Sequence, residues 1–424
     1  MRGSRMSARR GFAVRISLDE AVRTIAASVE PLPAEEVNFY ESLGRVLAED
    51  VVAGINVPQF DRAAVDGYAV IASDTFGASP ARPAKLRVVG SVKVGARGSK
   101  RLRRGEAVRI DTGARMPAGA DSVVMVENVV EEGGHVGVLS PVTPGKNVSK
   151  AGEDVRAGET VLRRGRVLGP ADIGLLASVR HLRPRVHRRP HVGVISTGSE
   201  LVAPHLSASG PHVVDANSYS IAAAVTAAGG IPHRLGIVPD EEKDLRRKIA
   251  SALKYDVVIV SGGSAVGRSD LVPEVISKMG DLKFHGAAIR PGGPSGFGVI
   301  GGKPVFCLAG FPAGALIAFD LLVRPALRKL QGLPADRGYL RVRAKLEEGV
   351  PSVLGRADVV RMKLMRRGKE ILARPMRITG SSMLTTVADA DGFVIVPESA
   401  EGLERGQEVE VEVYGRSYDW LNRG

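Results

Sequence analysis

Residues 191–202 read HVGVISTGSELV, in which a largely apolar run of five residues leads directly into a polar turn that contains glycine. An apolar run of this length, closed by small polar residues, is typical of a buried strand in a parallel sheet. The stretch predicts a strand over 191–195, with Ser196, Thr197 and Gly198 just beyond its carboxyl end.

Downstream of this strand, helix-like and strand-like patterns alternate. The expected helices cover 218–228, 241–253, 271–279 and 313–330, and the expected further strands cover 231–237, 256–260 and 304–308. Strands that alternate with helices favour a doubly wound, mostly parallel sheet. We therefore predict one α/β domain over residues 189–332.

The carboxyl edge of such a sheet is where ligands bind. Besides 196–198, the residues expected there are Ser261, Gly262 and Gly263 after one strand, and Ala309 with Gly310 after another. Glycine lets the backbone come close to a phosphate, hydroxyl groups donate hydrogen bonds to it, and a helix N-terminus favours its negative charge. Neither polar run matches a Walker A loop or a GxGxxG fingerprint. We expect a nucleotide or pterin-phosphate pocket at this edge.

Charged residues gather around the same edge. Glu200, Asp240 and Asp270 can supply oxygen ligands to a divalent cation. Arg290, Pro291 and Gly292 add a cation and a rigid turn. Taken alone, Arg290 is equally compatible with an ordinary surface arginine.

The segments on either side of the α/β domain differ from it in pattern. Short valine-rich runs separated by glycine, proline and charge predict a small β domain over 58–140, and residues 333–416 predict a second one. Near the start, Ser17 followed by Glu20 predicts a capped helix whose apolar face holds Leu18, Val22 and Ile25. Residues 1–15 are expected to form a disordered, arginine-rich arm.

Three polar constellations precede the α/β domain. Asp61 and Asp66 lie within DRAAVDGYA (61–69), Thr112 follows an apolar strand, and Asp154 ends a Gly-Glu-Asp run. Loop aspartates can orient a substrate or hold Mg²⁺, but they also cap turns. A Thr-Gly pair can bind an anion or simply make a tight turn. The pattern alone leaves these alternatives open.

Composition narrows the class of protein. The chain has 424 residues, a formal net charge of +13, 4% aromatic residues and a single cysteine, Cys307. These values exclude a disulfide framework and a cysteine-based zinc site, and they favour several domains with aliphatic cores. No signal core or membrane span is expected, so we predict a cytoplasmic protein that binds neither membrane nor nucleic acid.

In order along the chain, seven segments resemble those of the molybdopterin molybdenumtransferase family, which includes the C-terminal domain of gephyrin. The segments are PQFDRAAVDGYA (58–69), TGARMPAGADSVVMVE (112–127), GKNVSKAGED (145–154), VGVISTGSELV (192–202), the run 261–270, RPGGPSGFG (290–298) and GSSMLTT (380–386). Their order and spacing together make the resemblance specific, and it extends from Ile16 to Gly415.

The resemblance implies a multidomain fold that combines an α/β domain of the molybdopterin-binding type with two small β domains. It also implies an elongated connecting domain formed by residues 16–57 and 141–188, and a homodimer whose cleft draws on both subunits. The implied reaction inserts molybdenum or tungsten from the oxyanion into adenylated molybdopterin with release of AMP, assisted by Mg²⁺. Contact with the molybdopterin adenylyltransferase is a further expectation.

Family positions assign roles to single residues. The resemblance implies catalytic roles for Asp66, Thr112, Asp154 and Glu200, and metal ligation by Glu200, Asp240 and Asp270. It implies a ligand-binding position at Ser381. The loop chemistry described above adds the other expected ligand-binding residues, which are Ser196, Thr197, Gly198, Ser261, Gly262, Gly263, Arg290, Pro291 and Gly292.

The chain departs from the family pattern at several donors. Ser149, Ser199, Gly286 and Gly293 stand where the family usually has arginine, aspartate, lysine and lysine, residues 264–266 differ, and 308–314 reads LAGFPAG instead of LPGNPVS. We expect free N–H groups in the 308–314 loop to meet the positive end of the following helix dipole. The changed loop therefore predicts altered ligand choice, with folding unaffected.

Two other functions remain as alternatives. A catalytically altered relative acting as a cofactor-binding or scaffold protein would bind molybdopterin without turnover. A basic nucleic-acid binder would show steeply salt-dependent retention on DNA.

Overall fold

The computed structural model describes residues 15–96, 101–206, 210–262, 271–376 and 381–415. The chain divides into two compact units: Met1–Glu35 with His187–Gly424, called unit 1, and Glu36–Val186, called unit 2. The boundaries fall within strand β1 (Ala34–Glu36) and within strand β12 (Arg185–His187). The arm predicted over 1–15 lies almost entirely outside the described residues.

A six-stranded sheet forms the centre of unit 1. Its order is β16 (Ile231–Val238), β13 (His191–Thr197), β17 (Val257–Ser261), β21 (Lys303–Leu308), β20 (Gly296–Ile300) and β18 (Asp281–His285). The first four strands pair in parallel, as predicted, and β20 and β18 complete the sheet in antiparallel orientation. The sheet therefore has one carboxyl edge shared by four parallel strands.

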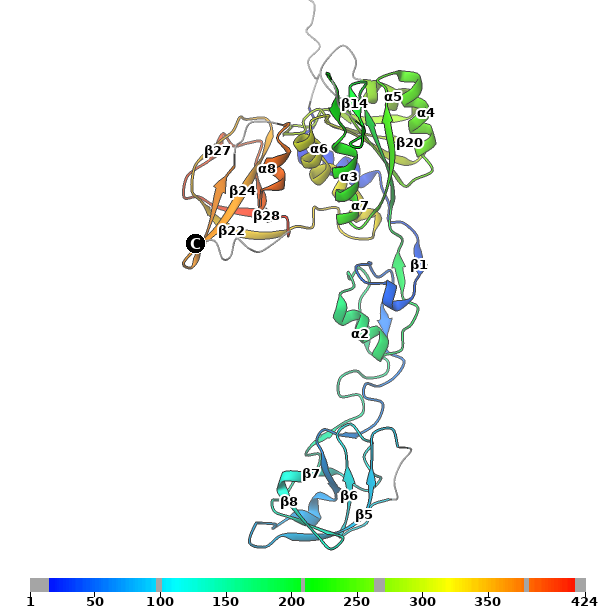
Figure 1. Cartoon of the computed structure of the whole chain (residues 1–424), viewed down its shortest axis with the longest axis vertical. Helices are drawn as coiled ribbons and strands as arrows, with labels where there is room; N and C mark the ends of the chain where they lie inside the picture. The colour runs from blue at the N-terminus through cyan, green and yellow to red at the C-terminus, as the bar shows by residue number, and fades with distance from the viewer. Residues whose placement is uncertain (1–14, 97–100, 207–209, 263–270, 377–380, 416–424) are drawn as a thin grey trace, which may run out of the picture. The chain divides into compact units, whose positions relative to one another are not determined.

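Each face of this sheet carries its own core, because neighbouring residues of a strand point to opposite faces. Val257 and Ile259 of β17 pack with helices α1, α3, α6 and α7, whereas Val258 and Val260 pack with α4 and α5. Figure 1 shows α3, α6 and α7 on one side of the strands and α4 and α5 on the other. The helices are α1 (Leu18–Ala27), α3 (Asn217–Ala227), α4 (Glu242–Ala252), α5 (Leu271–Met279), α6 (Pro312–Ala318) and α7 (Arg324–Leu330). Cys307 is fully buried in the core on the side of α4 and α5.

The helix predicted over 313–330 is interrupted. A π-helical turn, η4 (Phe319–Val323), separates α6 from α7. Pro325 has no N–H to donate to the carbonyl of Leu321, so the regular α-helical pattern cannot continue through this point. The predicted helix is therefore present from Pro312 to Leu330, but it is not α-helical throughout.

Helix α1 begins as predicted. The Ser17 hydroxyl accepts a hydrogen bond from the backbone N–H of Glu20, and Leu18 and Ile25 are buried. Ala21 completes the buried face, whereas Val22 is only partly buried. The helix packs into the core of the α/β sheet, so residues 16–35 belong to unit 1, although the sequence analysis grouped them with the connecting domain.

The C-terminal part of unit 1 is a small barrel. Pairings close a ring of five strands: β24 (Ala357–Arg367), β25 (Glu370–Pro375), β22 (Leu340–Leu346), β28 (Glu408–Val413) and β26 (Gly392–Val396). Strand β19 (Ile289–Arg290), which belongs to the α/β sequence, adds to β24 in parallel. The barrel and the α/β domain are thereby joined by backbone pairing.

Unit 2 contains a second six-stranded sheet, in the order β7 (Ser122–Met125), β4 (Gly67–Val70), β6 (Glu106–Ile110), β5 (Ala84–Val92), β9 (His135–Val138) and β8 (Val129–Glu132). A separate apolar cluster in unit 2 draws on residues 47–53 and 155–186, which lie on both sides of this sheet in the sequence. Its helix is α2 (Pro170–Ser178).

The remaining elements are short. They are η1 (Phe39–Glu41), β2 (Val51–Val52), β3 (Arg62–Ala63), η2 (Ala72–Thr75), η3 (Val126–Asn128), β10 (Val148–Ser149), β11 (Thr160–Leu162), β14 (Leu201–Val202), β15 (Val213–Val214), β23 (Val350–Pro351), α8 (Leu384–Ala388) and β27 (Gly402–Leu403).

Candidate functional site

The carboxyl end of β13 carries the first group of predicted ligand-binding residues. The Thr197 hydroxyl donates to Asp240 Oδ1 at 2.7 Å, and the backbone N–H of Gly198 donates to the carbonyl of Val238 at 3.2 Å. Since β13 and β16 are adjacent and parallel, these contacts tie the loops after the two strands together. Thr197 and Asp240 therefore lie side by side at the edge where the sequence places them.

A buried polar network lies behind this edge. The carboxylate of Asp215, which is 4% exposed, accepts hydrogen bonds from Ser196 Oγ at 2.9 Å and from the N–H and hydroxyl of Ser218 at 3.0 and 2.6 Å. A buried carboxylate is tolerated when such donors surround it. The network fixes the end of β13 against the start of α3.

The end of β17 is held by Asn217. Its side-chain Nδ2 donates to Ser261 Oγ and to the carbonyl of Gly310, both at 2.8 Å. Among the described residues Asn217 Oδ1 is buried without a hydrogen-bond partner. Asn217 thus links the loops after β17 and β21, two of the three segments predicted to bind ligand.

Gly262 allows the loop after β17 to pass close to β13. Its φ is +105°, and a Cβ at this position would overlap the carbonyl oxygen of Thr197. Only glycine fits both the dihedral angle and the space. Gly263 and Asp270, which the sequence analysis assigned to ligand and metal binding, lie outside the described residues.

The predicted metal ligands that can be placed are Glu200 and Asp240. Both are exposed and follow adjacent strands, β13 and β16. Within the described ranges no group of three or more His, Cys, Asp or Glu residues is arranged to hold a metal ion. Carboxylate oxygens from two neighbouring loops, with the Thr197 hydroxyl beside them, are nevertheless the donor types that a hard divalent cation such as Mg²⁺ prefers.

A second recess lies where the α/β domain meets the barrel. It has a volume of about 430 Å³ and is lined by Arg290, Pro291, Gly292, Ser381 and by residues that the sequence analysis did not single out. Those are Arg15, Ile289, Pro294, Arg356 and Arg361, and Gly293, one of the departures from the family pattern, also lines the recess. Four arginines therefore surround one cavity, which favours an anionic ligand.

Arg361 contributes to this charge from a buried position. Its side chain is 2% exposed, and burial lowers the pKa of its guanidinium, with the nearby charge of Arg290 acting in the same direction. The repulsion between like charges in a low-dielectric environment decreases when an anion binds between them. The cavity is therefore electrostatically suited to an oxyanion.

The altered loop 308–314 borders this cavity. Gly314 packs against Gly292, since a Cβ on Gly314 would lie 3.4 Å from the nitrogen of Gly292. The N–H of Gly314 donates to the carbonyl of Ser381 at 3.1 Å, that of Ala315 donates to Phe311, and Pro312 has none. The expectation of free N–H groups was therefore wrong at Pro312 and Gly314 of this loop. Phe311 is 61% exposed.

In unit 2, Asp66 and Thr112 form a pair. Asp66 Oδ1 accepts hydrogen bonds from the N–H and the hydroxyl of Thr112 at 2.6 and 2.8 Å. These hydrogen bonds, the backbone one first, lower the pKa of Asp66, so that the exposed carboxylate is ionised at neutral pH. The two residues, 46 positions apart in sequence, present one anionic group with a hydroxyl beside it.

The Gly-Glu-Asp segment reaches the same part of unit 2. Asp61 binds Lys150 Nζ and the N–H of Ala151, both at 2.8 Å, and the hydrogen bond from Lys150 is the main cause of its lowered pKa. Asp154 is exposed, and its N–H donates to the carbonyl of Val57. Lys150, next to the altered Ser149, is thus engaged by Asp61.

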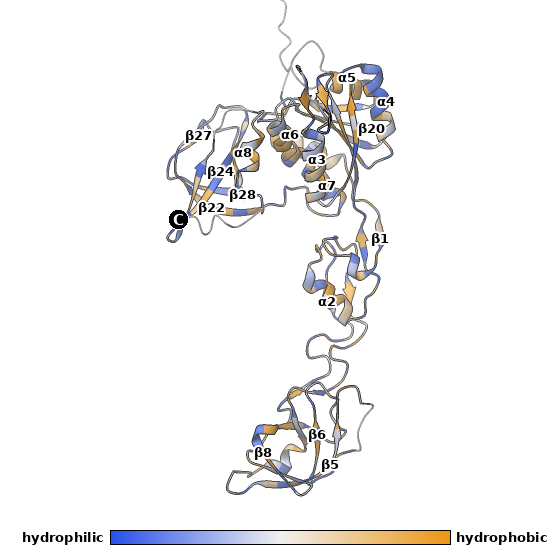
Figure 2. Cartoon of the chain, in the orientation of Figure 1, coloured by the Kyte–Doolittle hydropathy of each residue, from blue (hydrophilic) through white to orange (hydrophobic). Residues whose placement is uncertain are grey.

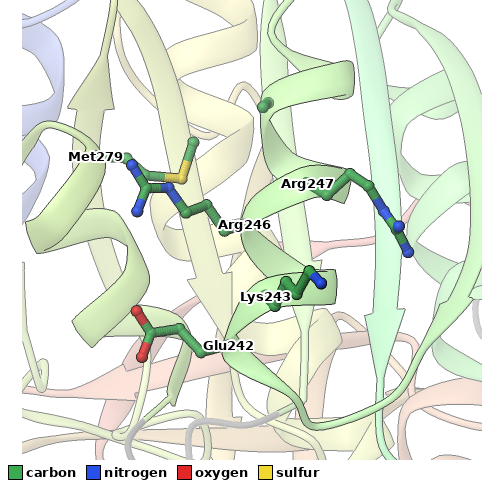
Figure 3. A pocket seen from close by; sticks show the side chains of 6 residues that line it. Glu242, Lys243, Arg246, Arg247 and Met279 are labelled. Atoms are coloured by element: carbon green, nitrogen blue, oxygen red, sulfur yellow. The ribbon is translucent and has the colours of Figure 1, made fainter.

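The open depression in Figure 3 lies along α4, where Glu242, Lys243, Arg246, Arg247 and Ala250 project beside Met279. Glu242 pairs with Lys278 at 2.8 Å, and Arg247 pairs with Asp244 at 2.5 Å. Figure 2 shows this helix largely in blue. Such pairs belong to an ordinary solvated helix face, and none of the predicted site residues lines this depression.

Asp215, Asn217 and Arg356 were missed by sequence reasoning. Asp215 had a signal, since VVDANS places an acidic residue immediately before a helix, with serine three positions later. Arg356 had none, because its position depends on the pairing of β24 with β19. None of the helices in the parts of the chain that the structure describes is long and apolar enough to cross a membrane.

Three family models match the chain. Residues 16–179 match the MoeA N-terminal region, domains I and II, residues 193–329 match a probable molybdopterin binding domain, and residues 343–414 match the MoeA C-terminal region, domain IV. The middle match covers the α/β sheet with its carboxyl edge, and the last covers most of the barrel.

Individual proteins are similar over nearly the whole length. A putative molybdopterin biosynthesis protein of Methanocaldococcus jannaschii is 36% identical over 89% of this chain and 91% of its own. Molybdopterin molybdenumtransferase 1 of Mycobacterium tuberculosis is 34% identical over 93% and 97%. The crystal structure of the molybdopterin biosynthesis MoeA protein of Pyrococcus horikoshii has a TM-score of 0.83, with 38% identity over 95% and 100%.

Proposed function

The chain belongs to the MoeA family of molybdopterin molybdenumtransferases, and on this premise we propose that it inserts molybdenum or tungsten from the oxyanion into adenylated molybdopterin, releasing AMP. Its general role is molybdenum cofactor biosynthesis. The observation that carries the specific reaction is the four-arginine cavity, which contains Arg290 and Ser381 and borders the loop after β21.

In this proposal the carboxyl edge of the sheet and the four-arginine cavity, both in unit 1, bind different parts of the substrates. Ser196, Thr197, Gly198, Ser261, Gly262 and Gly263 hold the adenylated pterin at the carboxyl edge, where hydroxyls and close backbone suit a phosphate. Arg290, with Pro291, Gly292 and Ser381, holds the metal oxyanion, because guanidinium donors match tetrahedral oxyanions.

Glu200, Asp240 and Asp270 are the proposed ligands of Mg²⁺. When bound, this ion would polarise the phosphoanhydride and neutralise the charge of the departing AMP. Asp66 and Asp154 contribute carboxylates from unit 2, and Thr112 orients that of Asp66 through the two hydrogen bonds described above.

The reaction can be tested with the purified chain, adenylated molybdopterin and molybdate. AMP release that depends on molybdate, together with reconstitution of an apo-molybdoenzyme by the product, is the expected result. Binding of the pterin without molybdate-dependent AMP release would contradict the proposal and would indicate a scaffold protein.

We further propose that the protein is a cytoplasmic homodimer that contacts the molybdopterin adenylyltransferase. A dimer is expected because members of the family form an active cleft from residues of two subunits. Light scattering at micromolar concentration should give twice the 44.7 kDa mass of one chain. A particle of the single-chain mass would contradict the dimer.

The double variant Phe311→Asn with Gly314→Ser is expected to tighten binding of the anionic ligand by roughly 5- to 150-fold. Two added neutral hydrogen bonds are worth about 1–3 kcal/mol. The structure accommodates both changes, since Phe311 is exposed and a Cβ at Gly314 makes ordinary contacts. Isothermal titration with AMP, molybdate and tungstate measures the effect.

Phe76→Asn is the matched control, because Phe76 is a similarly exposed phenylalanine of unit 2, at 60%. It should leave every affinity unchanged. If the double variant gains affinity for none of the three ligands, the loop does not contribute to the ligand site.

A further inference from the structure

One buried carboxylate lies directly behind the arginine-lined cavity. Asp358 of β24 is 1% exposed, and its Oδ2 lies 2.6 Å from an Nη of Arg290 while accepting a hydrogen bond from Ser352 Oγ at 2.9 Å. Its Oδ1 forms an ion pair with Nε of Arg356 at 3.1 Å, although the two atoms are not aligned for a hydrogen bond. A single acid thus contacts two of the four arginines that line the cavity.

Backbone pairing fixes the position of Asp358 relative to Arg290. Strand β19 pairs in parallel with the start of β24, with Arg290 opposite Asp358, and the N–H of Ala357 donates to the carbonyl of Ala288 at 2.7 Å. Asp358 also pairs with Val396 of β26 on its other side. The carboxylate is therefore fixed by the barrel, whereas the side chain of Arg290, 38% exposed, reaches the cavity.

A guanidinium has five N–H donors in a planar fork. Asp358 contacts one Nη of Arg290 and Nε of Arg356. Because each guanidinium is planar, these contacts fix the directions in which its remaining N–H donors point. Without a fixed acceptor, two mutually repelling arginines on long side chains would spread over many rotamers.

We propose that Asp358 is a positioning residue for oxyanion recognition, which orients the guanidinium groups of Arg290 and Arg356 so that both present donors to one tetrahedral metal oxyanion. This inference rests on the proposed function, and it assigns to the barrel a role in that site. It also explains why the acid is buried: water would otherwise compete with the arginines for its oxygens.

The Asp358→Asn variant separates positioning from simple charge neutralisation. Removing the negative charge makes the cavity more positive, so a purely electrostatic role predicts unchanged or tighter anion binding. Positioning predicts the opposite sign, because the amide keeps only one acceptor oxygen and turns an NH2 donor group toward the second arginine. We expect Kd for molybdate to rise about 10- to 100-fold, with Kd for AMP unchanged.

Glu412→Gln is the matched control. Glu412 is another buried acid of the barrel, 7% exposed and paired with Arg337, and neither residue lines the cavity. It should leave Kd for molybdate unchanged. If Asp358→Asn does not fold, Ser352→Ala removes one hydrogen bond that orients the carboxylate, and a rise of about 3- to 10-fold is expected.

Titration with molybdate and AMP, alongside thermal unfolding of each variant, gives the readouts. Unchanged or tighter molybdate binding in the folded Asp358 or Ser352 variant overturns the inference, and so does an equal loss for AMP and molybdate. Absence of AMP release by the wild-type chain, with molybdate binding weakened only by the Asp358 and Ser352 variants, would contradict the proposed reaction and leave the inference supported.

Discussion

The variants Asp66→Asn and Glu200→Gln are each expected to fold normally and to lose metal insertion by about 100-fold or more. Both changes keep the shape of the side chain and remove its charge. Losing a charged group that acts on the reacting centre costs two or more orders of magnitude in rate. Because both carboxylates are exposed, their replacement should cost little stability.

The local contacts of Asp66 support this separation of rate from stability. An asparagine oxygen can still accept the two hydrogen bonds from Thr112, so the loop should keep its conformation. What changes is the ionised state, which those hydrogen bonds favour by lowering the pKa of Asp66. A role that depends on negative charge is therefore removed without disturbing the fold.

The measurement is molybdate-dependent AMP release under saturating substrate, with circular dichroism and thermal unfolding as checks of folding. Two exposed acids outside the site serve as matched controls: Glu132→Gln on β8 of unit 2, and Glu274→Gln on α5 of unit 1. Full turnover in both the Asp66 and the Glu200 variants would remove these residues from the proposed mechanism.

Gly262→Ala is expected to destabilise unit 1 by about 3 kcal/mol or more. The new methyl group would need a positive φ that alanine disfavours, and it would overlap the carbonyl oxygen of Thr197. Because that oxygen belongs to the backbone of β13, relief requires the loop or the strand end to move. The same movement should weaken ligand binding at the carboxyl edge.

Gly301→Ala separates the two causes. Gly301 lies between β20 and β21 of the same sheet with φ +57°, but a Cβ there meets no atom within 4 Å. Gly301→Ala should therefore lower the free energy of unfolding by only about 1–2 kcal/mol, which is the cost of a positive φ for alanine. Urea unfolding followed by circular dichroism gives both values, and equal losses for the two variants would show that the contact with Thr197 is unimportant.

Most of the α/β domain could be predicted because its signals are local. The buried strand before Ser196 and the helix that follows Asp240 each show their period in a single short window. The cap at Ser17 is equally local, since its acceptor and donor are three residues apart. The position of the carboxyl edge then followed from the general geometry of parallel sheets.

What could not be predicted depends on contacts between distant segments. Strands β18 and β20 are short, and their antiparallel addition to the parallel sheet depends on the pairing of β18 with β20 and of β20 with β21. The interruption at η4 required the position of Pro325 to be weighed against a long apolar pattern. Arg290 could be predicted, but its contact with Asp358 has no sequence signal, because the two residues meet only through the pairing of β19 with β24.

That pairing also bears on how the protein can be divided or recombined. The matched C-terminal region begins at residue 343, yet the strand that completes the start of β24 is supplied by residues 289–290. A barrel expressed as a separate cassette would leave the hydrogen-bonding groups of Ala357 and Asp358 uncovered, and an open strand edge invites self-association. A chimera between relatives should therefore exchange the short β19 segment together with the barrel, so that each edge keeps the neighbour with which it folds.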